Sequence, residues 1–157
     1  MVIAIDFDGT CVRHAYPKIG EEIGAVPVLK RLVEEGHKLI LYTMRSDIKG
    51  ISPVTGKEEN GGLLDAIEWF ERHEIELYAV QQNPSQKNWT SSPKCYAELY
   101  IDDAALGCPL ITPYGENGKE RPFVDWRAIE MILESSGVLK VRTAKKCDIV
   151  SQYKSFL

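Results

Sequence analysis

Residues 1–10 read MVIAIDFDGT, and this stretch decides the fold and points to the chemistry. Val2–Ile5 is a short apolar run rich in β-branched residues, which is typical of a buried strand. Two aspartates, Asp6 and Asp8, come directly after it, and Gly9 then permits a sharp turn. Alternate side chains of a strand share a face, so we expect both carboxylates to point roughly the same way where the strand ends.

Outward from this strand, apolar strands alternate with amphipathic helices. Further strands are predicted at 39–42, 76–80 and 99–101, with a short fifth one at 109–112. Helices are predicted at 21–36, 62–74 and 126–136, with Asp125 as the cap of the last one. This alternation predicts an α/β fold: a three-layer α/β/α, Rossmann-like domain with a central parallel sheet and helices on both faces. The unbroken apolar strand runs agree with burial on both sides.

Length and composition are those of a single globular domain. The chain has 157 residues, of which 44% are hydrophobic and 27% charged. We expect one domain over 1–157, with a core at about 1–137 and a basic tail at 138–157. No run of about 18 apolar residues is present, so no membrane-spanning helix is expected. The polar stretches 46–62 and 113–122 are predicted to be loops, and neither is long enough to be a second domain.

Charge and cysteine usage limit the partners and the compartment. Nineteen basic and 23 acidic side chains give a net charge of −4, which disfavours broad nucleic-acid binding through a basic surface. Residues 138–157 hold five basic residues and one acid, which we interpret as a solvated terminal segment. The chain does not start like a signal peptide, and its four cysteines form no C-x-x-C pair. We therefore expect reduced thiols and a cytoplasmic location.

Reactive residues follow three of the predicted strands, in the segments 6–10, 43–45 and 102–103. In open parallel sheets, ligands bind beyond the carboxyl ends of the strands, so we expect these segments to meet at one rim. Acids at turns often only cap turns and helices. Four aspartates at one rim repel one another unless a cation lies between them, and Mg²⁺ prefers such oxygen ligands. The sequence therefore predicts a Mg²⁺ site formed by Asp6, Asp8, Asp102 and Asp103.

The motifs and their order resemble the haloacid dehalogenase-like hydrolase superfamily, whose members are mostly phosphatases. Its D-x-D-x-[TV] motif is similar to residues 6–10, and its Thr or Ser after the next core strand matches Thr43. Its closing acidic pair matches residues 102–103, and its lysine matches Lys94 best, with Lys87 as the other candidate. The resemblance covers about residues 1–112.

The resemblance implies a Mg²⁺-dependent phosphomonoester hydrolase. Asp6 is implied to attack the phosphorus and form an aspartyl-phosphate, while Asp8 is implied to serve as general acid and then general base. Aspartate at position 8 suits phosphatases and phosphomutases rather than the dehalogenase and ion-pump branches. The resemblance also implies a metal site in which Mg²⁺ is held by Asp6, the main-chain carbonyl of Asp8 and Asp102. Asp103 is implied to act through a water or from outside the direct ligands.

A second set of residues is expected to hold the phosphoryl group. It consists of the hydroxyl of Thr43, the ammonium of Lys94 and main-chain or side-chain donors of Phe7, Gly9, Thr10, Met44 and Arg45. For Arg45, a surface salt bridge carries about equal weight. His14 is interpreted as an exposed flap residue rather than a catalyst.

Only residues 7–42, 36 in number, separate Asp6 from Thr43, so we expect no large cap domain over the site. The segments 46–62 and 14–18 are the available lids. The expected partner is a phosphorylated small molecule; a nucleic-acid end and association of identical chains stay open. Two other functions also stay open: a phosphotransferase or phosphomutase with the same nucleophile, and a metal-dependent binding or regulatory module without useful turnover.

Overall fold

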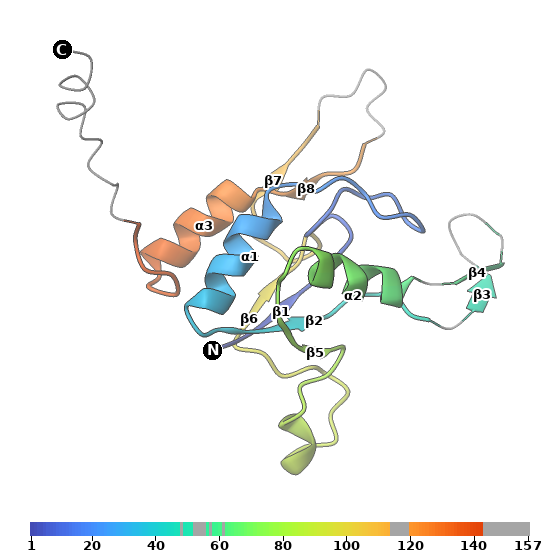
Figure 1. Cartoon of the computed structure of the whole chain (residues 1–157), viewed down its shortest axis with the longest axis horizontal. Coiled ribbons are helices and arrows are strands. Elements are labelled where there is room, and N and C mark those ends of the chain that lie inside the picture. The colour runs from blue at the N-terminus through green and yellow to red at the C-terminus, as the bar shows by residue number, and fades with distance from the viewer. Residues whose placement is uncertain (48, 52–55, 57, 61, 114–119, 143–157) are drawn as a thin grey trace.

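The computed structural model describes residues 1–47, 49–51, 56, 58–60, 62–113 and 120–142. Its centre is a four-stranded, all-parallel sheet in the order β5-β2-β1-β6, with three α-helices, which is a Rossmann-like α/β arrangement (Figure 1). The sheet strands are β1 (Val2–Ile5), β2 (Lys38–Leu41), β5 (Leu77–Val80) and β6 (Leu99–Ile101). The helices are α1 (Ala25–Glu34), α2 (Leu63–Arg72) and α3 (Trp126–Ser135). The predicted α/β class with a parallel sheet is therefore confirmed.

Strand β1 lies between β2 and β6 in the sheet. It pairs with β2 on one side, with Ile5 opposite Leu41, and with β6 on the other, with Ile5 opposite Ile101. The parallel register brings the carboxyl ends of these three strands to the same rim. The residues that follow them in the chain are therefore neighbours in space.

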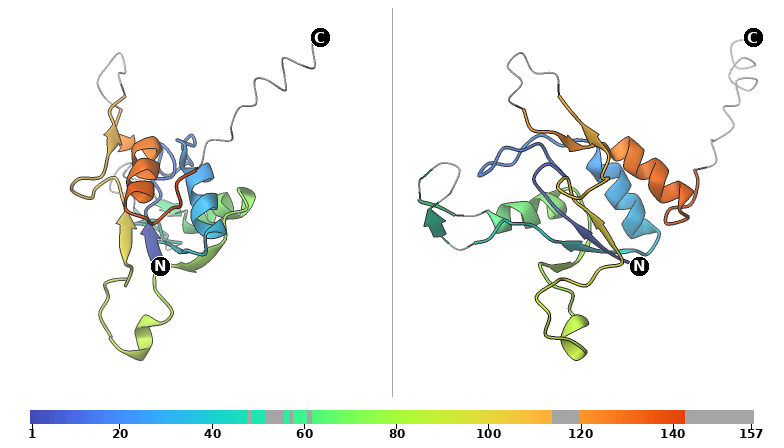
Figure 2. Two further views of the ribbon diagram at one scale, coloured as in Figure 1. Left: turned by 90° about the vertical axis from the view of Figure 1, so that its left-hand side faces the viewer. Right: turned by 180° about the vertical axis from the view of Figure 1, so that it is seen from behind.

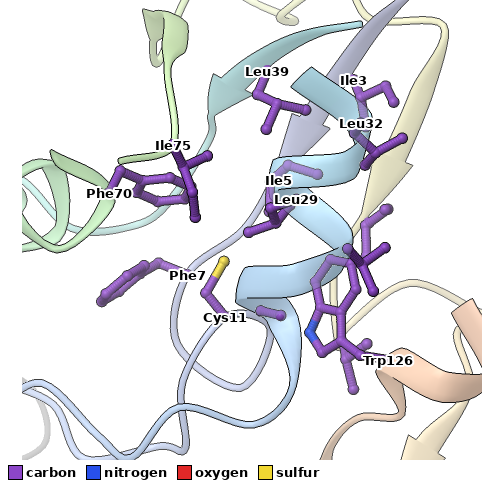
Figure 3. Close-up of a cluster of buried hydrophobic side chains, with 14 of the residues drawn as sticks. Ile3, Ile5, Phe7, Cys11, Leu29, Leu32, Leu39, Phe70, Ile75 and Trp126 are labelled. Atoms are coloured by element: carbon purple, nitrogen blue, oxygen red, sulfur yellow. The ribbon is translucent and has the colours of Figure 1, made fainter. Parts of the chain in front are cut away.

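The core fills one face of this sheet (Figure 3). Ile3 and Ile5 of β1 point into one buried cluster, together with side chains from all three helices. Phe70 of α2 and Trp126 of α3 lie in this cluster and are almost fully buried. Helix α1 begins at Ala25 rather than at the predicted residue 21, because residues 21–22 pair with the segment 12–13 instead.

The opposite face of the sheet carries no α-helix among the described residues, although the sequence predicted helices on both faces. Ala4 and Ile40 point to this side and are buried. The connection from β5 to β6 (residues 81–98) lies against it and forms only one 3₁₀ turn, η1 (Gln86–Asn88). Figure 2 shows η1 at the far end of this connection, away from the three helices.

Two short antiparallel ribbons stand outside the central sheet. Strands β3 (Lys49–Ile51) and β4 (Glu58–Asn60) pair within the segment that the sequence assigned to a loop. Strand β7 (Leu110–Ile111) pairs with β8 (Phe123–Val124), so the expected fifth strand exists but does not join the parallel sheet. None of the described helices is long and apolar enough to cross a membrane.

Candidate metal and phosphate site

Three carboxylates gather at the carboxyl ends of β1 and β6. Asp6 follows β1, and Asp102 and Asp103 follow β6; one oxygen from each lies within 4.8 Å of the others. The pairing of the two strands sets this closeness, because the amide of Asp6 donates to the carbonyl of Ile101 at 3.0 Å. The strand ends that the sequence expected at one rim therefore do meet there.

The turn after Asp6 is held from several sides. Gly9 has a φ of +85°, and a Cβ at this position would lie 2.2 Å from the ring of His14, so glycine is required there. The buried hydroxyl of Thr10 lies 3.4 Å from a carboxylate oxygen of Asp6 and accepts from the amide of Asp103 at 3.0 Å. Thr10 thus joins the two loops that carry the acids. The indole of Trp126 donates to the carbonyl of Thr10 at 2.6 Å and anchors the turn to α3.

The main-chain amides of this turn are largely engaged within the turn itself. The Gly9 amide donates to the carbonyl of Val12 at 2.7 Å, and the Thr10 amide donates to that of Phe7 at 3.2 Å. Both amides are therefore engaged within the turn, and their expected role toward a phosphate stays a prediction. The Phe7 amide bonds to the Asp6 carboxylate and lowers its pKa. The tight turn explains this, since its own hydrogen bonds satisfy the amides that it would otherwise expose.

Asp6 carries a strongly perturbed charge. The pKa of Asp6 is raised to about 7. Burial is the largest cause, the Phe7 amide lowers the pKa, and the nearby carboxylates of Asp102, Asp103 and Asp8 add to the rise. Such a shift means that the ionised form of Asp6 lacks a compensating positive charge. The same arrangement is common where a side chain has a chemical role.

Asp8 lies outside the acidic trio because an arginine holds its side chain. Arg45 donates from Nε to one Asp8 oxygen at 2.6 Å and from a terminal nitrogen to the other at 2.7 Å. Arg45 is 2% exposed and also donates to the carbonyls of Lys18, Pro17 and Gly62. The guanidinium is thus buried rather than part of a surface bridge, and its expected role as a phosphate ligand stays a prediction. The planar guanidinium fits a carboxylate in two parallel bonds, which explains the preference.

Thr43 and Met44 follow β2 at the same rim. The Thr43 hydroxyl accepts from the Arg45 amide at 3.2 Å, and its main chain is held by Gln81, which accepts from the Thr43 amide at 3.1 Å and donates to its carbonyl at 2.6 Å. Met44 is almost fully exposed. Gln81 was missed by the sequence analysis, although it is the first polar residue after β5 and so shares the positional signal of the other site residues.

Two lysines were candidates for the phosphate-binding role. Lys94 is exposed, and its ammonium lies 5.9 Å from the ring centre of Tyr100, two residues before Asp102. Lys87 lines a hollow formed within the 81–98 connection itself. Neither makes an ion pair with the acidic trio among the described residues. Lys94 lies in the 81–98 connection, five residues before β6, the strand that Asp102 follows.

His14 is not the exposed flap residue that the sequence suggested. Its Nε2 lies 3.2 Å from an Asp103 oxygen, and its side chain is only 14% exposed. The ring packs over Gly9, which has no side chain to displace it. The guanidinium of Arg121 also approaches Asp103, at 3.9 Å. No spacing in the sequence links positions 14 and 103, so pattern reasoning had no signal for this contact.

The donor set fits a hard divalent cation. Three carboxylate oxygens within 4.8 Å of one another are the ligand type that Mg²⁺ selects, with waters and a phosphate oxygen completing its shell. The raised pKa of Asp6 also indicates that a positive charge would be stabilised there.

Comparison with known proteins adds one similar structure. The chain is 37% identical to a conserved protein from Bacteroides thetaiotaomicron, with a TM-score of 0.60, and the match covers 86% of this chain and 91% of the other. No protein-family model matches the chain, and no curated protein matches it.

Proposed function

The chain belongs to the same family as the conserved Bacteroides thetaiotaomicron protein. This relationship assigns no reaction, so we propose the function from the site itself. We propose that it is a Mg²⁺-dependent phosphomonoester hydrolase of the haloacid dehalogenase-like type, without a large cap. The observation that carries this proposal is the trio of Asp6, Asp102 and Asp103 beside a threonine-braced turn at the rim of a parallel sheet. Phosphorylated ligands bind at such rims.

Asp6 is the nucleophile in this proposal. One of its carboxylate oxygens forms a bond to phosphorus as the bond from phosphorus to the ester oxygen breaks, and water later cleaves the resulting aspartyl-phosphate. Asp6, Asp102 and Asp103 would hold Mg²⁺, which would supply the positive charge that lets one anion approach another. The bond from Thr10 to Asp6 fixes the direction of the attacking carboxylate.

Asp8 supplies the proton that the leaving oxygen needs and later takes one from the attacking water. For this, Asp8 has to exchange at least one of its two bonds with Arg45 for the substrate. Thr43 and Lys94 are proposed to hold the phosphoryl oxygens once a substrate is bound.

A metal-dependent binding or regulatory module is the second candidate, and one observation favours it. Both oxygens of Asp8 are taken by Arg45, and an Asp8 that never leaves this pair has no proton to donate. Such a protein would bind Mg²⁺ and phosphate without turning over.

The test is phosphate release from a panel of phosphomonoesters with Mg²⁺ or with EDTA, using wild type and Asp6→Asn. Asp65→Asn, an exposed aspartate on α2, is the matched control. We expect release with Mg²⁺ only, loss of at least a thousandfold in Asp6→Asn, and no change in the control. Alcohols added as acceptors separate hydrolysis from phosphoryl transfer. Mg²⁺ binding without turnover in wild type would support the binding module instead.

A further inference from the structure

The helix-free face of the sheet carries the acids and two tyrosines together. Side chains of a strand alternate between faces, and Ile5, Leu41 and Ile101 all point into the helix-covered core. The neighbouring residues Asp6, Tyr42, Tyr100 and Asp102 therefore lie on the other face. The strand pairing continues to this level, because the Tyr42 amide donates to the Ile5 carbonyl at 2.8 Å.

The tyrosines extend the site along this face. The rings of Tyr42 and Tyr100 meet edge to face, with centres 6.4 Å apart, and the Lys94 ammonium lies over the Tyr100 ring. Tyr100 precedes Asp102 by two residues, which is about 7 Å along a strand. The surface formed by Tyr42, Tyr100 and Lys94 therefore begins two residues along the strand from Asp102.

Beyond Tyr100 this surface becomes a hollow of about 330 Å³. Its walls include Trp89, Lys94, Tyr96 and Tyr100. Trp89 is 61% exposed and Tyr96 is 44% exposed, and their rings meet edge to face with centres 5.4 Å apart. Large exposed aromatic side chains gathered around one hollow are typical of a ligand site.

Buried amides hold the hollow in shape. The Gln86 side chain donates to the carbonyls of Ser92 and Lys94, both at 2.7 Å, and accepts from the Tyr96 amide at 2.7 Å. The buried Asn83 side chain donates to the Tyr96 carbonyl at 2.9 Å. The loop that presents Lys94 and Tyr96 is therefore built in advance of any ligand, which lowers the entropic cost of binding.

From this placement we infer that the substrate is a phosphomonoester whose leaving group carries a planar aromatic ring, and that the ring binds in the hollow of Trp89, Tyr96 and Tyr100 while the phosphate lies at Asp6. The inference rests on the proposed function. Nucleobases and aryl groups share this chemistry, since both offer a flat π-face for stacking on exposed tryptophan and tyrosine. Lys94 lines the hollow with its ammonium over the Tyr100 ring, and it would offer a positive charge to the ligand's phosphate.

The test uses three probes: adenosine 5′-monophosphate, 4-nitrophenyl phosphate and ribose 5-phosphate. In Trp89→Ala, we expect KM to rise about tenfold for the aromatic ester or esters that bind in the hollow. The kcat of those esters, and both KM and kcat for ribose 5-phosphate, should stay unchanged. Trp89→Phe should retain most of the affinity. Met131→Ala, which removes another exposed apolar side chain on α3, is the control. Which aromatic ester responds to Trp89→Ala distinguishes a nucleotide from an aryl ester.

A second readout separates this inference from the proposed function. Adenosine and 4-nitrophenol have no phosphate, and their binding is followed by chemical-shift changes of the Trp89 indole, which is exposed while those of Trp69 and Trp126 are buried. Shifts at Trp89 without hydrolysis of any ester would retain the hollow as a ring-binding site and overturn the hydrolase. Hydrolysis with no Trp89 shifts and equal sensitivity of all three esters to Trp89→Ala would overturn the inference and leave the hydrolase standing.

Discussion

Two arginines are buried in the part of the chain that the structure describes, and their surroundings differ. Arg31 of α1 is 6% exposed and lies between helices, with Glu130 at 2.6 Å and Glu134 at 2.7 Å, both from α3. Arg45 is 2% exposed and lies at the strand ends, where it holds Asp8. Around Arg31, the acids of α3 are paired with a cation. Around Arg45, Asp8 is paired but the neighbouring trio of acids is crowded.

The difference teaches how to separate a structural charge cluster from a functional one. A buried cation whose acids all bond to it holds elements together, as Arg31 holds α1 to α3 and also bonds to the Lys140 carbonyl. A cluster with surplus acid is a cost to folding that a ligand can relieve. The raised pKa of Asp6 reflects its burial first and this surplus of acid second.

The largest effect expected within this comparison comes from replacing Asp8, the partner of Arg45. In Asp8→Asn, turnover should fall by roughly 10²–10⁴-fold, because the general acid and base is lost. The fold should persist with a loss of about 1–3 kcal/mol, because Arg45 keeps one oxygen partner but loses its countercharge. Steady-state kinetics and urea unfolding measure the two effects. Asp47→Asn, an exposed acid nearby, is the control, and a wild-type rate in Asp8→Asn would refute the role of Asp8.

The raised pKa of Asp6 should make the free energy of unfolding depend on pH when Mg²⁺ is absent. The folded pKa of Asp6 is about 7 against an ordinary 3.8, so the native state keeps a proton that the unfolded state has lost. Its stabilising contribution is present below pH 4 and is lost as the pH rises through 7. Relative to Asp6→Asn, the free energy of unfolding of wild type should fall by on the order of 4 kcal/mol between pH 4 and 8.

Urea unfolding of both proteins across this range checks the prediction, because groups other than Asp6 cancel in the difference. At pH 8, Mg²⁺ should stabilise wild type more than Asp6→Asn. A pH-independent difference between the two proteins would mean that the Asp6 charge is already compensated.

Breaking the Arg31 region should affect stability and not chemistry. Arg31→Ala removes the partner of two half-buried glutamates, which should cost about 3 kcal/mol. Activity per folded molecule should stay at the wild-type level, because no site residue contacts Arg31 among the described residues. Lys30→Ala, which breaks an exposed pair with Glu74, is the control and should cost below about 1 kcal/mol. A large loss of turnover in Arg31→Ala would link the two regions.

Most of the fold could be predicted because local pattern decides it. The apolar strand runs gave the parallel sheet, and Asp125 before an amphipathic stretch marked the start of α3 at Trp126. Residues 81–98 were beyond this reasoning, because nothing local says which face of the sheet a polar connection covers. The antiparallel partner of β7 was likewise set by a contact across the loop 113–122.

The site was predictable in its acids and less so in its cations. Parallel topology brings Asp6 and Asp102 together once the strands are known. Arg45 was expected to face a phosphate, but the partner that holds it, Asp8, is 37 residues away in the sequence. His14 beside Asp103 depends in the same way on a turn at Gly9 that only the folded chain reveals.

The smallest effect is expected at Asp125, an acid whose carboxylate already accepts hydrogen bonds from main-chain amides. The Asp125 carboxylate caps α3 and accepts from the amides of Arg127 at 3.0 Å and Ala128 at 3.2 Å. Asp125→Ala should lower the free energy of unfolding by about 1 kcal/mol, and Asp125→Asn should restore most of it, because an amide oxygen also caps. Neither change should alter the stabilisation by Mg²⁺, since this carboxylate already has its partners. Thermal unfolding with and without Mg²⁺ measures both quantities, and an Asp125→Ala protein that no longer responds to Mg²⁺ would place the cation near α3 instead of at Asp6.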